Sequence, residues 1–277
     1  MTVGLVQMNS RDDKEANIRR AEELIDRAAE RGARLVALPE YVNFLGEREQ
    51  HESIAEPIPG PITERFAAKA REHDIYLLGG SMHERTDQPG KFYNTSVLFG
   101  PDGEMLAKYR KIHLFDIEIS GNVSANESAT ILPGEDIVTA EVDGHTVGLT
   151  VCYDLRFPEL YRLLALEGAE VLFVPAAFTM FTGKDHWHVL LRARAIENQA
   201  FVVAPAQIGP HGVDKKQCYG HSLVVDPWGT VLADAPNNEG VITAELDFDA
   251  LRTIRREVPS LANRRPGAYR EKSPVVR

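Results

Sequence analysis

The sequence predicts an α/β protein, a four-layer α-β-β-α sandwich built from two similar halves. Strand-like and helix-like segments alternate along most of the 277 residues, which predicts sheets covered by helices. The strands are rich in Val, Leu, Phe and Ala, as expected when both faces of a sheet are buried. Four stretches of the first half recur in the second half in the same order. We therefore expect the two halves to pack sheet against sheet, with the helices outside.

The first half contains a simple order of elements. Thr2–Met8 predicts a buried strand, and Asp12 or Asp13 can cap a helix predicted for Asp13–Arg31. Gly32 follows where a helix-ending glycine is expected. A strand at Arg34–Leu38 ends at Pro39-Glu40, and a helix at Thr63–His73 and a strand at Ile75–Gly79 follow it. Val97–Phe99 and Met105–Lys108 then form a hairpin around the turn at 100–103.

The second half repeats this order with loops of different length. Four pairs of stretches align: TVGLVQM (2–8) with TVGLTVC (146–152), GARLVALPE (32–40) with GAEVLFVPA (168–176), AREHDIYLLG (70–79) with AIENQAFVVA (195–204), and FYNTSVLFGPDG (92–103) with CYGHSLVVDPWG (218–229). One match could arise by chance among apolar strands, but four in the same order indicate a duplication. The halves span about 1–115 and 145–250, and a tail follows at 251–277.

Composition limits the classes of partner. The formal charge of −10 argues against nucleic acid or an anionic membrane, because both favour basic patches. Only two cysteines are present, Cys152 and Cys218, so a disulfide framework is not expected and a reducing compartment is. The apolar run at Thr2–Met8 is too short for a signal peptide. These observations predict a cytoplasmic protein.

Three chemically capable residues are expected at strand ends, where ligands bind in open α/β sheets. Glu40 ends the second strand, Cys152 ends the first strand of the second half, and Lys111 follows the hairpin. The residues that correspond to Cys152 and Glu40 in the duplication are Met8 and Ala176, which cannot perform the same chemistry. One composite site, rather than two equivalent sites, is therefore predicted.

Each of these residues also has an ordinary structural interpretation. Cys152 lies between an apolar strand and a helix that begins near Pro158, as a nucleophile on a sharp turn would, but buried structural cysteines are common. Glu40 is a partly desolvated carboxylate suited to proton transfer, or else a helix cap or surface acid. Lys111 is a fixed ammonium that stabilises negative charge, or else a solvated strand end.

Three motifs resemble the nitrilase superfamily of carbon–nitrogen hydrolases, and in particular its Nit branch of amidases: LPEYVNF around Glu40, YRKIHLFD around Lys111 and VCYDLRFPEL around Cys152. Further stretches from ESATILPG (127–134) to RRPGAY (264–269) extend the resemblance over nearly the whole chain. It implies a single carbon–nitrogen hydrolase domain over 1–277, the α-β-β-α fold, and a dimer or larger homo-oligomer with helices near the nucleophile at the interface. It also implies a Glu–Lys–Cys triad at Glu40, Lys111 and Cys152, with Glu127 as a supporting carboxylate.

The resulting hypothesis is a thiol amidase that releases ammonia from a small linear amide. Glu40 takes the thiol proton, Cys152 attacks the carbonyl, and Lys111 with the backbone N–H of Tyr153 holds the oxyanion. Water then hydrolyses the thioester, and no metal or organic cofactor is required. The triad alone does not exclude a nitrilase acting on a small nitrile. The alternative of another class is a non-catalytic binding module on the same scaffold, which predicts substitution of a triad residue, whereas all three are present.

Substrate contacts are predicted for Tyr41, Arg156, Ala177, Phe178 and His186. A substrate carboxylate would need a cation from the segments that flank the site, and the candidates are Arg156, Arg162, Lys184, Arg192 and Arg194.

Two other features have a weaker interpretation. His186-Trp187-His188 has a His-x-His spacing found at metal sites, but no Cys or acid cluster beside it in the sequence completes a shell, and packing is the preferred interpretation. The basic tail Arg256–Tyr269 is a candidate for packing on a partner subunit.

Overall fold

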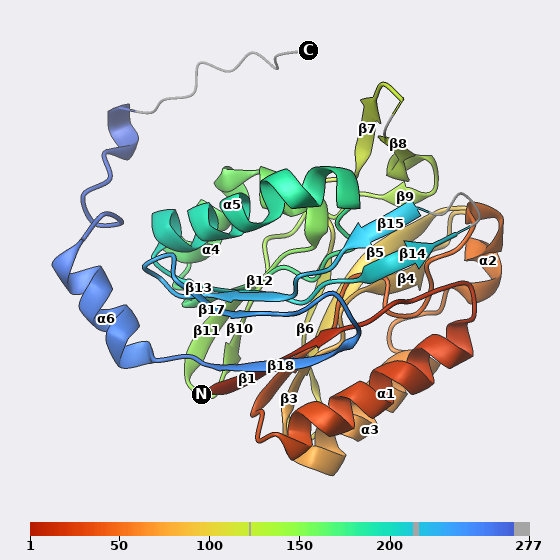
Figure 1. Ribbon diagram of the computed structural model, residues 1–277, viewed down its shortest axis with the longest axis horizontal. Coiled ribbons are helices and arrows are strands. Elements are labelled where there is room, and N and C mark those ends of the chain that lie inside the picture. Colours follow the sequence, from red (N-terminus) through yellow and green to blue (C-terminus); the bar gives the residue numbers. More distant parts are fainter. Residues whose placement is uncertain (122, 213–215, 269–277) are drawn as a thin grey trace.

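The computed structural model describes residues 1–121, 123–212 and 216–268. Two sheets stack face to face, and helices cover the outer side of each, which confirms the predicted α-β-β-α sandwich (Figure 1). The helices are α1 (Lys14–Glu30), α2 (His51–Ile54), α3 (Pro61–His73), α4 (Pro158–Leu166), α5 (Met180–Asn198) and α6 (Phe248–Glu257). No helix in the described ranges is long and apolar enough to span a membrane.

The first sheet has eight strands. Its main path, in spatial order, is β18 (Gly240–Glu245), β1 (Thr2–Gln7), β2 (Leu35–Ala37), β3 (Tyr76–Leu78), β5 (Phe92–Phe99) and β4 (Met82–Arg85). Two further strands pair with β5, namely β6 (Met105–Arg110) and β9 (Ile131–Leu132). The strands β1, β2 and β3 are parallel, whereas β5 is antiparallel to β3.

The second sheet repeats this arrangement. Its six strands, in spatial order, are β10 (Thr139–Val142), β11 (His145–Leu149), β12 (Val171–Phe173), β13 (Phe201–Ala204), β16 (Leu223–Val225) and β17 (Val231–Asp234). The strands β11, β12 and β13 are parallel and β16 is antiparallel to β13. Each element of the aligned sequence pairs therefore has a counterpart in the other sheet, as the duplication predicts.

One edge strand of the first sheet comes from the second half of the chain. The sequence interval 145–250 contains β18, yet β18 pairs antiparallel with β1 over its whole length, with Val3 opposite Ala244. In the second sheet the corresponding edge is covered by β10, which precedes β11. An uncovered strand edge exposes a row of N–H and C=O groups, so each first strand needs such a neighbour.

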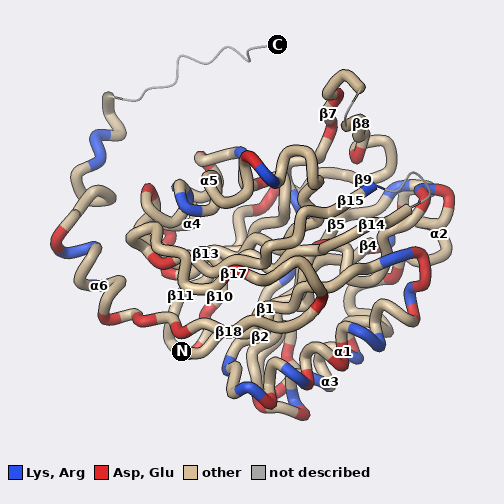
Figure 2. Tube along the Cα trace, viewed as in Figure 1, with Lys and Arg blue, Asp and Glu red and all other residues tan. Residues whose placement is uncertain are grey.

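Alternation along the strands builds two apolar layers. Val3 and Leu5 of β1 point into the core between the sheets, whereas Val6 packs beneath the outer helices. Helix α1 begins where Asp13 accepts a hydrogen bond from the Ala16 N–H over 2.9 Å. Its buried face covers the first sheet, and the charged residues of α1 and α3 lie on the outside with both signs interspersed (Figure 2).

Two short hairpins and the tail extend beyond the layers. The hairpins are β7 (Asp116–Ile119) with β8 (Val123–Asn126), and β14 (Ile208–His211) with β15 (Lys216–Tyr219). Helix α6 packs through Phe248 and Leu251, and the chain then runs outward to residue 268 (Figure 1). Of the predicted tail Arg256–Tyr269, Tyr269 lies outside the described residues.

Candidate active site

Three buried side chains meet where strands of the two sheets end. Glu40 follows β2, Lys111 follows β6 directly, and Cys152 follows β11 at the start of a 3-10 segment, Cys152–Arg156. Glu40 and Lys111 are each 1% exposed and Cys152 is 7% exposed. The two sheets thus contribute to one site, as the divergence of the repeated strand ends predicts.

Lys111 bridges two carboxylates. Its Nζ donates to Glu40 Oε1 over 3.0 Å and to Glu127 Oε2 over 2.9 Å. Burial opposes the charge on Lys111, but the negative charges of Glu127 and Glu40 outweigh it and raise the pKa of Lys111 well above its ordinary value. The lysine is therefore a permanent cation at this site.

Glu40 is held by three donors. Besides Lys111, the Asn94 Nδ2 donates to Glu40 Oε1 over 2.9 Å and the Ala177 N–H donates to Glu40 Oε2 over 2.7 Å. The carboxylate is thereby fixed between the sheets, with Asn94 on β5 and Ala177 after β12. Ala177, predicted as a substrate contact, uses its N–H for Glu40.

Glu127 opens a short 3-10 segment, Glu127–Ala129, and accepts from three further groups. Tyr41 Oη and the Phe115 N–H each donate to it over 2.6 Å, and Asn94 donates over 3.3 Å. Burial would raise the pKa of Glu127, but the Lys111 charge prevails and lowers it. Burial and the Glu127 charge raise the pKa of Tyr41 well above its ordinary value, so Tyr41 remains a neutral donor.

The Cys152 thiol lies within hydrogen-bonding reach of Glu40. Burial, followed by the Glu40 charge, raises the pKa of Cys152 well above its ordinary value, although Lys111 acts in the opposite direction. The raised pKa favours the protonated thiol at neutral pH. The backbone at Cys152 is left-handed, with φ of 48°, a conformation that non-glycine residues adopt at strained functional turns.

Asp154 fixes the turn that carries Cys152. Its fully buried carboxylate accepts from Tyr109 Oη over 2.7 Å, from the Val151 N–H over 2.8 Å, and from the His113 N–H and Nδ1 over 3.0 and 2.8 Å. Tyr109 and His113 flank Lys111 in sequence, so this one carboxylate connects the turn that carries Cys152 to the lysine segment.

A cavity of about 870 Å³ opens above these groups. Cys152, Lys111, Glu40 and Glu127 contribute to its wall. Among the predicted contact residues, those that line the cavity are Tyr41, Tyr153, Ala177 and Phe178.

Two predicted contacts lie outside the described lining. Arg156 and His186 do not line the cavity; instead Arg156 Nη1 lies 3.3 Å from His186 Nδ1, and the guanidinium covers the outer side of the Phe178 ring. The sequence places both residues near the pocket, but their side chains are directed to each other.

One of the predicted carboxylate-binding cations reaches the cavity, namely Lys184. The guanidinium groups of Arg162, Arg192 and Arg194 instead donate to backbone carbonyls of Glu197, Gly229 and Leu155, respectively. Two further cations line the cavity: Arg48, which begins a 3-10 segment at Arg48–Gln50, and Lys216, the first residue of β15. Neither was predicted from the sequence, because their short segments carry no periodic pattern that would place them at the cavity.

Comparison with known proteins decides the family. The family model described as carbon-nitrogen hydrolase matches residues 2–256. The chain belongs to the carbon-nitrogen hydrolase family. One curated relative of this carbon-nitrogen hydrolase is deaminated glutathione amidase of Synechocystis sp., which is 45% identical over 94% of this chain and 96% of the relative. Another is omega-amidase NIT2 of Homo sapiens, which is 41% identical over 96% of each chain.

A solved structure connects the family to cysteine chemistry. A variant of the amidase from Nesterenkonia sp. AN1 superimposes with a TM-score of 0.81 at 27% identity, covering 99% of this chain and 97% of that chain. It shows covalent addition of the acetamide moiety of fluoroacetamide at its active-site cysteine. The sequence-based prediction of a nitrilase-superfamily amidase with an active-site cysteine is confirmed. Of the two cysteines in this carbon-nitrogen hydrolase, Cys152 lines the cavity and Cys218 does not.

Proposed function

We propose that this amidase hydrolyses the terminal amide of a small linear substrate that carries a carboxylate, through a thioester on Cys152. The observation that carries the proposal is the convergence of a neutral thiol, a carboxylate and a permanent cation at the base of one cavity. The two curated relatives are named for amides of this size, deaminated glutathione and omega-amides.

Glu40 begins the proposed reaction as general base. It takes the Cys152 proton as sulfur attacks the amide carbonyl, and the S–C bond forms while the C=O π pair moves onto oxygen. The resulting oxyanion is stabilised by the Lys111 ammonium. The Tyr153 N–H assists, since it lies in the first turn of the 3-10 segment, where N–H groups have no partner within the segment.

The tetrahedral intermediate then expels ammonia. Protonated Glu40 gives its proton to the departing nitrogen, and the C–N bond breaks to leave the thioester. Glu40 next deprotonates a water molecule, which attacks the thioester, and the same proton returns to sulfur as the acid leaves. Glu127 keeps Lys111 directed at the carbonyl oxygen throughout, because it holds the ammonium at 2.9 Å.

The substrate carboxylate is assigned to the cations of the cavity wall, Arg48, Lys184 and Lys216. These cations place positive charge at the cavity wall of a chain whose formal charge is −10. Lys184 is the preferred partner because it projects from α5, a rigid helix, whereas Arg48 and Lys216 belong to peripheral segments.

The decisive experiment compares three matched compounds: an amide with a terminal carboxylate, the methyl ester of that amide, and the corresponding nitrile. Ammonia release should be fastest from the carboxylate amide, and Lys184→Met should raise its KM while leaving that of the ester unchanged. Equal KM values for acid and ester would refute the carboxylate assignment, and faster release from the nitrile would favour a nitrilase.

The nucleophile is tested separately. Cys152→Ala should abolish ammonia release from the amide while its unfolding midpoint stays close to that of the wild type, and Cys218→Ala provides the matched control because Cys218 is buried outside the cavity lining. Rapid-quench intact-mass measurement of the wild type should show the acyl adduct. Turnover by Cys152→Ala would disprove the thioester route. A wild type that releases no ammonia from any of the three compounds would instead favour a non-catalytic binding module.

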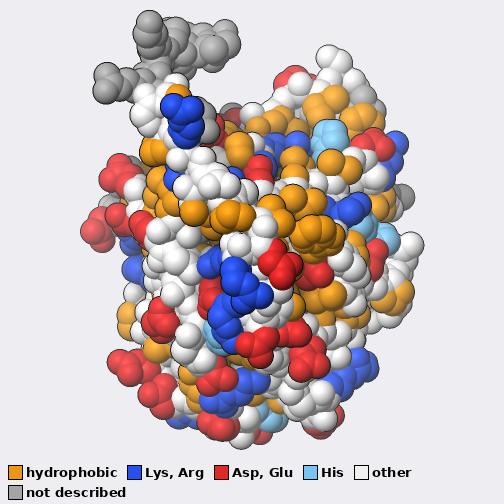
Figure 3. Space-filling view, turned by 90° about the vertical axis from the view of Figure 1, so that its left-hand side faces the viewer, with side chains coloured by type: hydrophobic (Ala, Val, Ile, Leu, Met, Phe, Trp, Pro, Cys, Tyr) orange, Lys and Arg blue, Asp and Glu red, His pale blue; other side chains and the backbone are white. Residues whose placement is uncertain are grey.

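We also propose that the protein forms a homodimer through the outer face of α4 and α5. Large apolar side chains on this face and the neighbouring turn are exposed: Leu163, Leu166, Val189, Ile196 and Trp228. Figure 3 shows apolar side chains gathered on the side of the molecule seen from the left of Figure 1. Sedimentation should give a dimer for the wild type and a monomer for Val189→Asp; a monomeric wild type contradicts the proposal.

Both cysteines are free, which is compatible with the proposed cytoplasmic location.

A further inference from the structure

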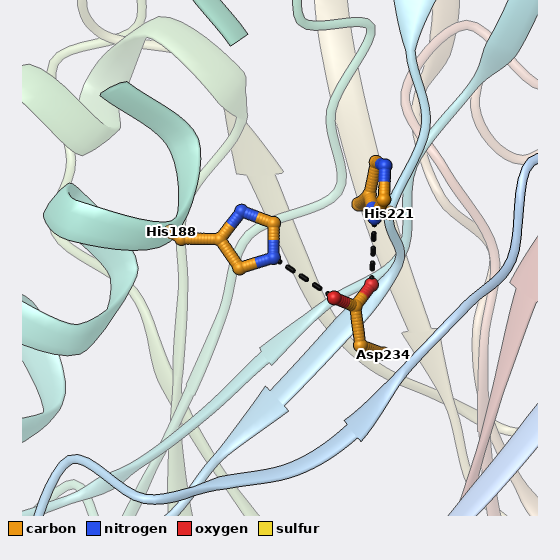
Figure 4. Close-up of side chains that lie close together, drawn as sticks. All are labelled: His188, His221 and Asp234. Carbon is orange, nitrogen blue, oxygen red and sulfur yellow. Dashed lines mark hydrogen bonds and ion pairs between the residues drawn. The ribbon is translucent and has the colours of Figure 1, made fainter. Parts of the chain in front are cut away.

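We propose that His188, His221 and Asp234 form a binding site for one Zn²⁺ ion on the second sheet, separate from the amidase site. The three side chains come from α5, from the turn between β15 and β16, and from the end of β17 (Figure 4). None of them lines the catalytic cavity. The His-x-His motif is therefore divided in the fold: His186 contacts Arg156, whereas His188 meets two residues distant in sequence.

The separations between the three groups fit a metal shell. Asp234 Oδ2 lies 3.0 Å from His188 Nε2, and Asp234 Oδ1 lies 2.8 Å from His221 Nδ1. The candidate ligand atoms all lie within 4.8 Å of one another. Tetrahedral Zn²⁺ with ligands at about 2.1 Å requires neighbouring donors roughly 3.4 Å apart. The two contacts of Asp234 would therefore lengthen by about 0.4–0.6 Å when the ion binds.

The surrounding structure holds these ligands in place. The Trp187 Nε1–H donates to the His221 carbonyl over 2.8 Å, which fixes the turn against the helix that carries His188. The Tyr219 ring stacks on the His221 ring with centroids 4.5 Å apart. His221 itself has a φ of 56°, a left-handed backbone that its neighbours enforce. Ligands on rigid elements lose little conformational freedom when an ion binds.

The charges also favour a cation here. Asp234 is paired with the two histidines, and within the described ranges it has no ion pair with Lys or Arg. A second cluster, Asp26 with Glu72 and His73, already contains a cation, because Lys69 Nζ lies 2.7 Å from Asp26 and 2.9 Å from Glu72. In that second cluster the Lys69 ammonium already supplies the positive charge that pairs with the two acids.

The donor set selects the kind of ion. Two imidazole nitrogens and one carboxylate oxygen suit Zn²⁺, whereas Mg²⁺ and Ca²⁺ prefer all-oxygen shells. The side chains are 32%, 23% and 37% exposed for His188, His221 and Asp234, so an ion can enter and a water can complete the shell. The ion would connect α5 to β17. Because α5 also supplies Thr182 and Lys184 to the cavity wall, the site would stabilise that wall without touching substrate.

The test is a titration of chelator-treated full-length protein with ZnCl₂, followed by calorimetry and by thermal unfolding. The wild type should bind about one Zn²⁺ per chain and should unfold at a higher temperature with Zn²⁺ than with Mg²⁺. His188→Gln and Asp234→Asn should each lose this equivalent and the temperature shift.

His186→Gln is the matched control, since His186 lies on the same helix, two positions away, and should bind as the wild type does. Three outcomes would overturn the proposal: His186→Gln fails to bind Zn²⁺, both His188→Gln and Asp234→Asn still bind one Zn²⁺ per chain, or the wild type binds none. Binding that disappears in Cys152→Ala instead would place the ion at the catalytic thiol and equally reject this site. The readouts do not depend on amide hydrolysis, so failure here is distinct from failure of the proposed function.

Discussion

Replacing Lys111 by methionine removes the cation that two buried carboxylates share, while the methionine fills a similar volume. Glu40 and Glu127 would then keep the amide of Asn94 as their common donor, at 2.9 and 3.3 Å. Breaking a buried ion pair by removing one partner costs about 3–5 kcal/mol, because the remaining charge stays desolvated. We expect the free energy of unfolding at pH 7.5 to fall by an amount in this range, about 4 kcal/mol.

The loss should depend on pH, and its sign follows from Glu127. In the wild type the pKa of Glu127 is lowered, so its ionised form contributes stability above the ordinary carboxyl pKa, and this is lost as the pH falls through the folded value. Without Lys111 burial dominates and raises that pKa, so the ionised form becomes destabilising. The difference in unfolding free energy between variant and wild type should therefore shrink on acidification, by about 1.4 kcal/mol per pH unit where one proton is taken up.

The assay is urea unfolding of both proteins at pH 7.5 and pH 5.5. Lys69→Met is the matched control: Lys69 also joins two acids, Asp26 and Glu72, but the Glu72 side chain is 58% exposed. Exposed pairs contribute about 0–1 kcal/mol, so this variant should lose little and show little pH dependence. A loss below about 1 kcal/mol for Lys111→Met, or one that is the same at both pH values, would refute the electrostatic argument.

Three further substitutions test the scaffold by urea unfolding. Gly80→Ala should cost at least about 3 kcal/mol, since φ is 65° and the new Cβ would lie 2.1 Å from the Pro39 carbonyl oxygen. Gly90→Ala is the control: φ is 70°, no neighbour lies within 4 Å, and the substitution should cost about 1–2 kcal/mol. Equal losses for the two variants would contradict the clash. Asp154→Asn should cost about 3 kcal/mol or more because four hydrogen bonds converge on the charge, and a loss under about 1 kcal/mol would contradict its anchoring role. Tyr41→Phe should cost about 1–2 kcal/mol, and an unchanged midpoint would show that its 2.6 Å bond to Glu127 contributes nothing.

The strand ends were predictable because chemistry and position coincide there. Glu40 and Cys152 each end an apolar strand, so the pattern that predicts the strand also places the side chain at the edge of the sheet. Glu127 was predicted through the family resemblance, because its segment has no periodic pattern of its own. The duplication predicted the common strand order of the two sheets.

Asn94 and Asp154 were missed for a different reason. Asn94 lies inside β5, and its importance depends on register: the Lys111 N–H donates to the Asn94 carbonyl over 2.9 Å, which places both side chains beside Glu40. Asp154 lies within the VCYDLRFPEL motif, yet only the fold brings Tyr109 and His113 to it. A polar residue in an apolar strand was the available signal for Asn94. The cavity-wall cations Arg48 and Lys216 had no comparable signal.

The pairing of β18 with β1 has a consequence for synthesis on the ribosome. Strand β1 waits for a strand that is synthesised roughly 240 residues later, because Val3 pairs with Ala244. At typical translation rates of about 5–20 residues per second, the intervening chain takes about 10–50 s to emerge. During that time one edge of β1 remains open, and an early termination product would expose it permanently. We therefore expect nascent chains that lack β18 to require chaperones or to aggregate.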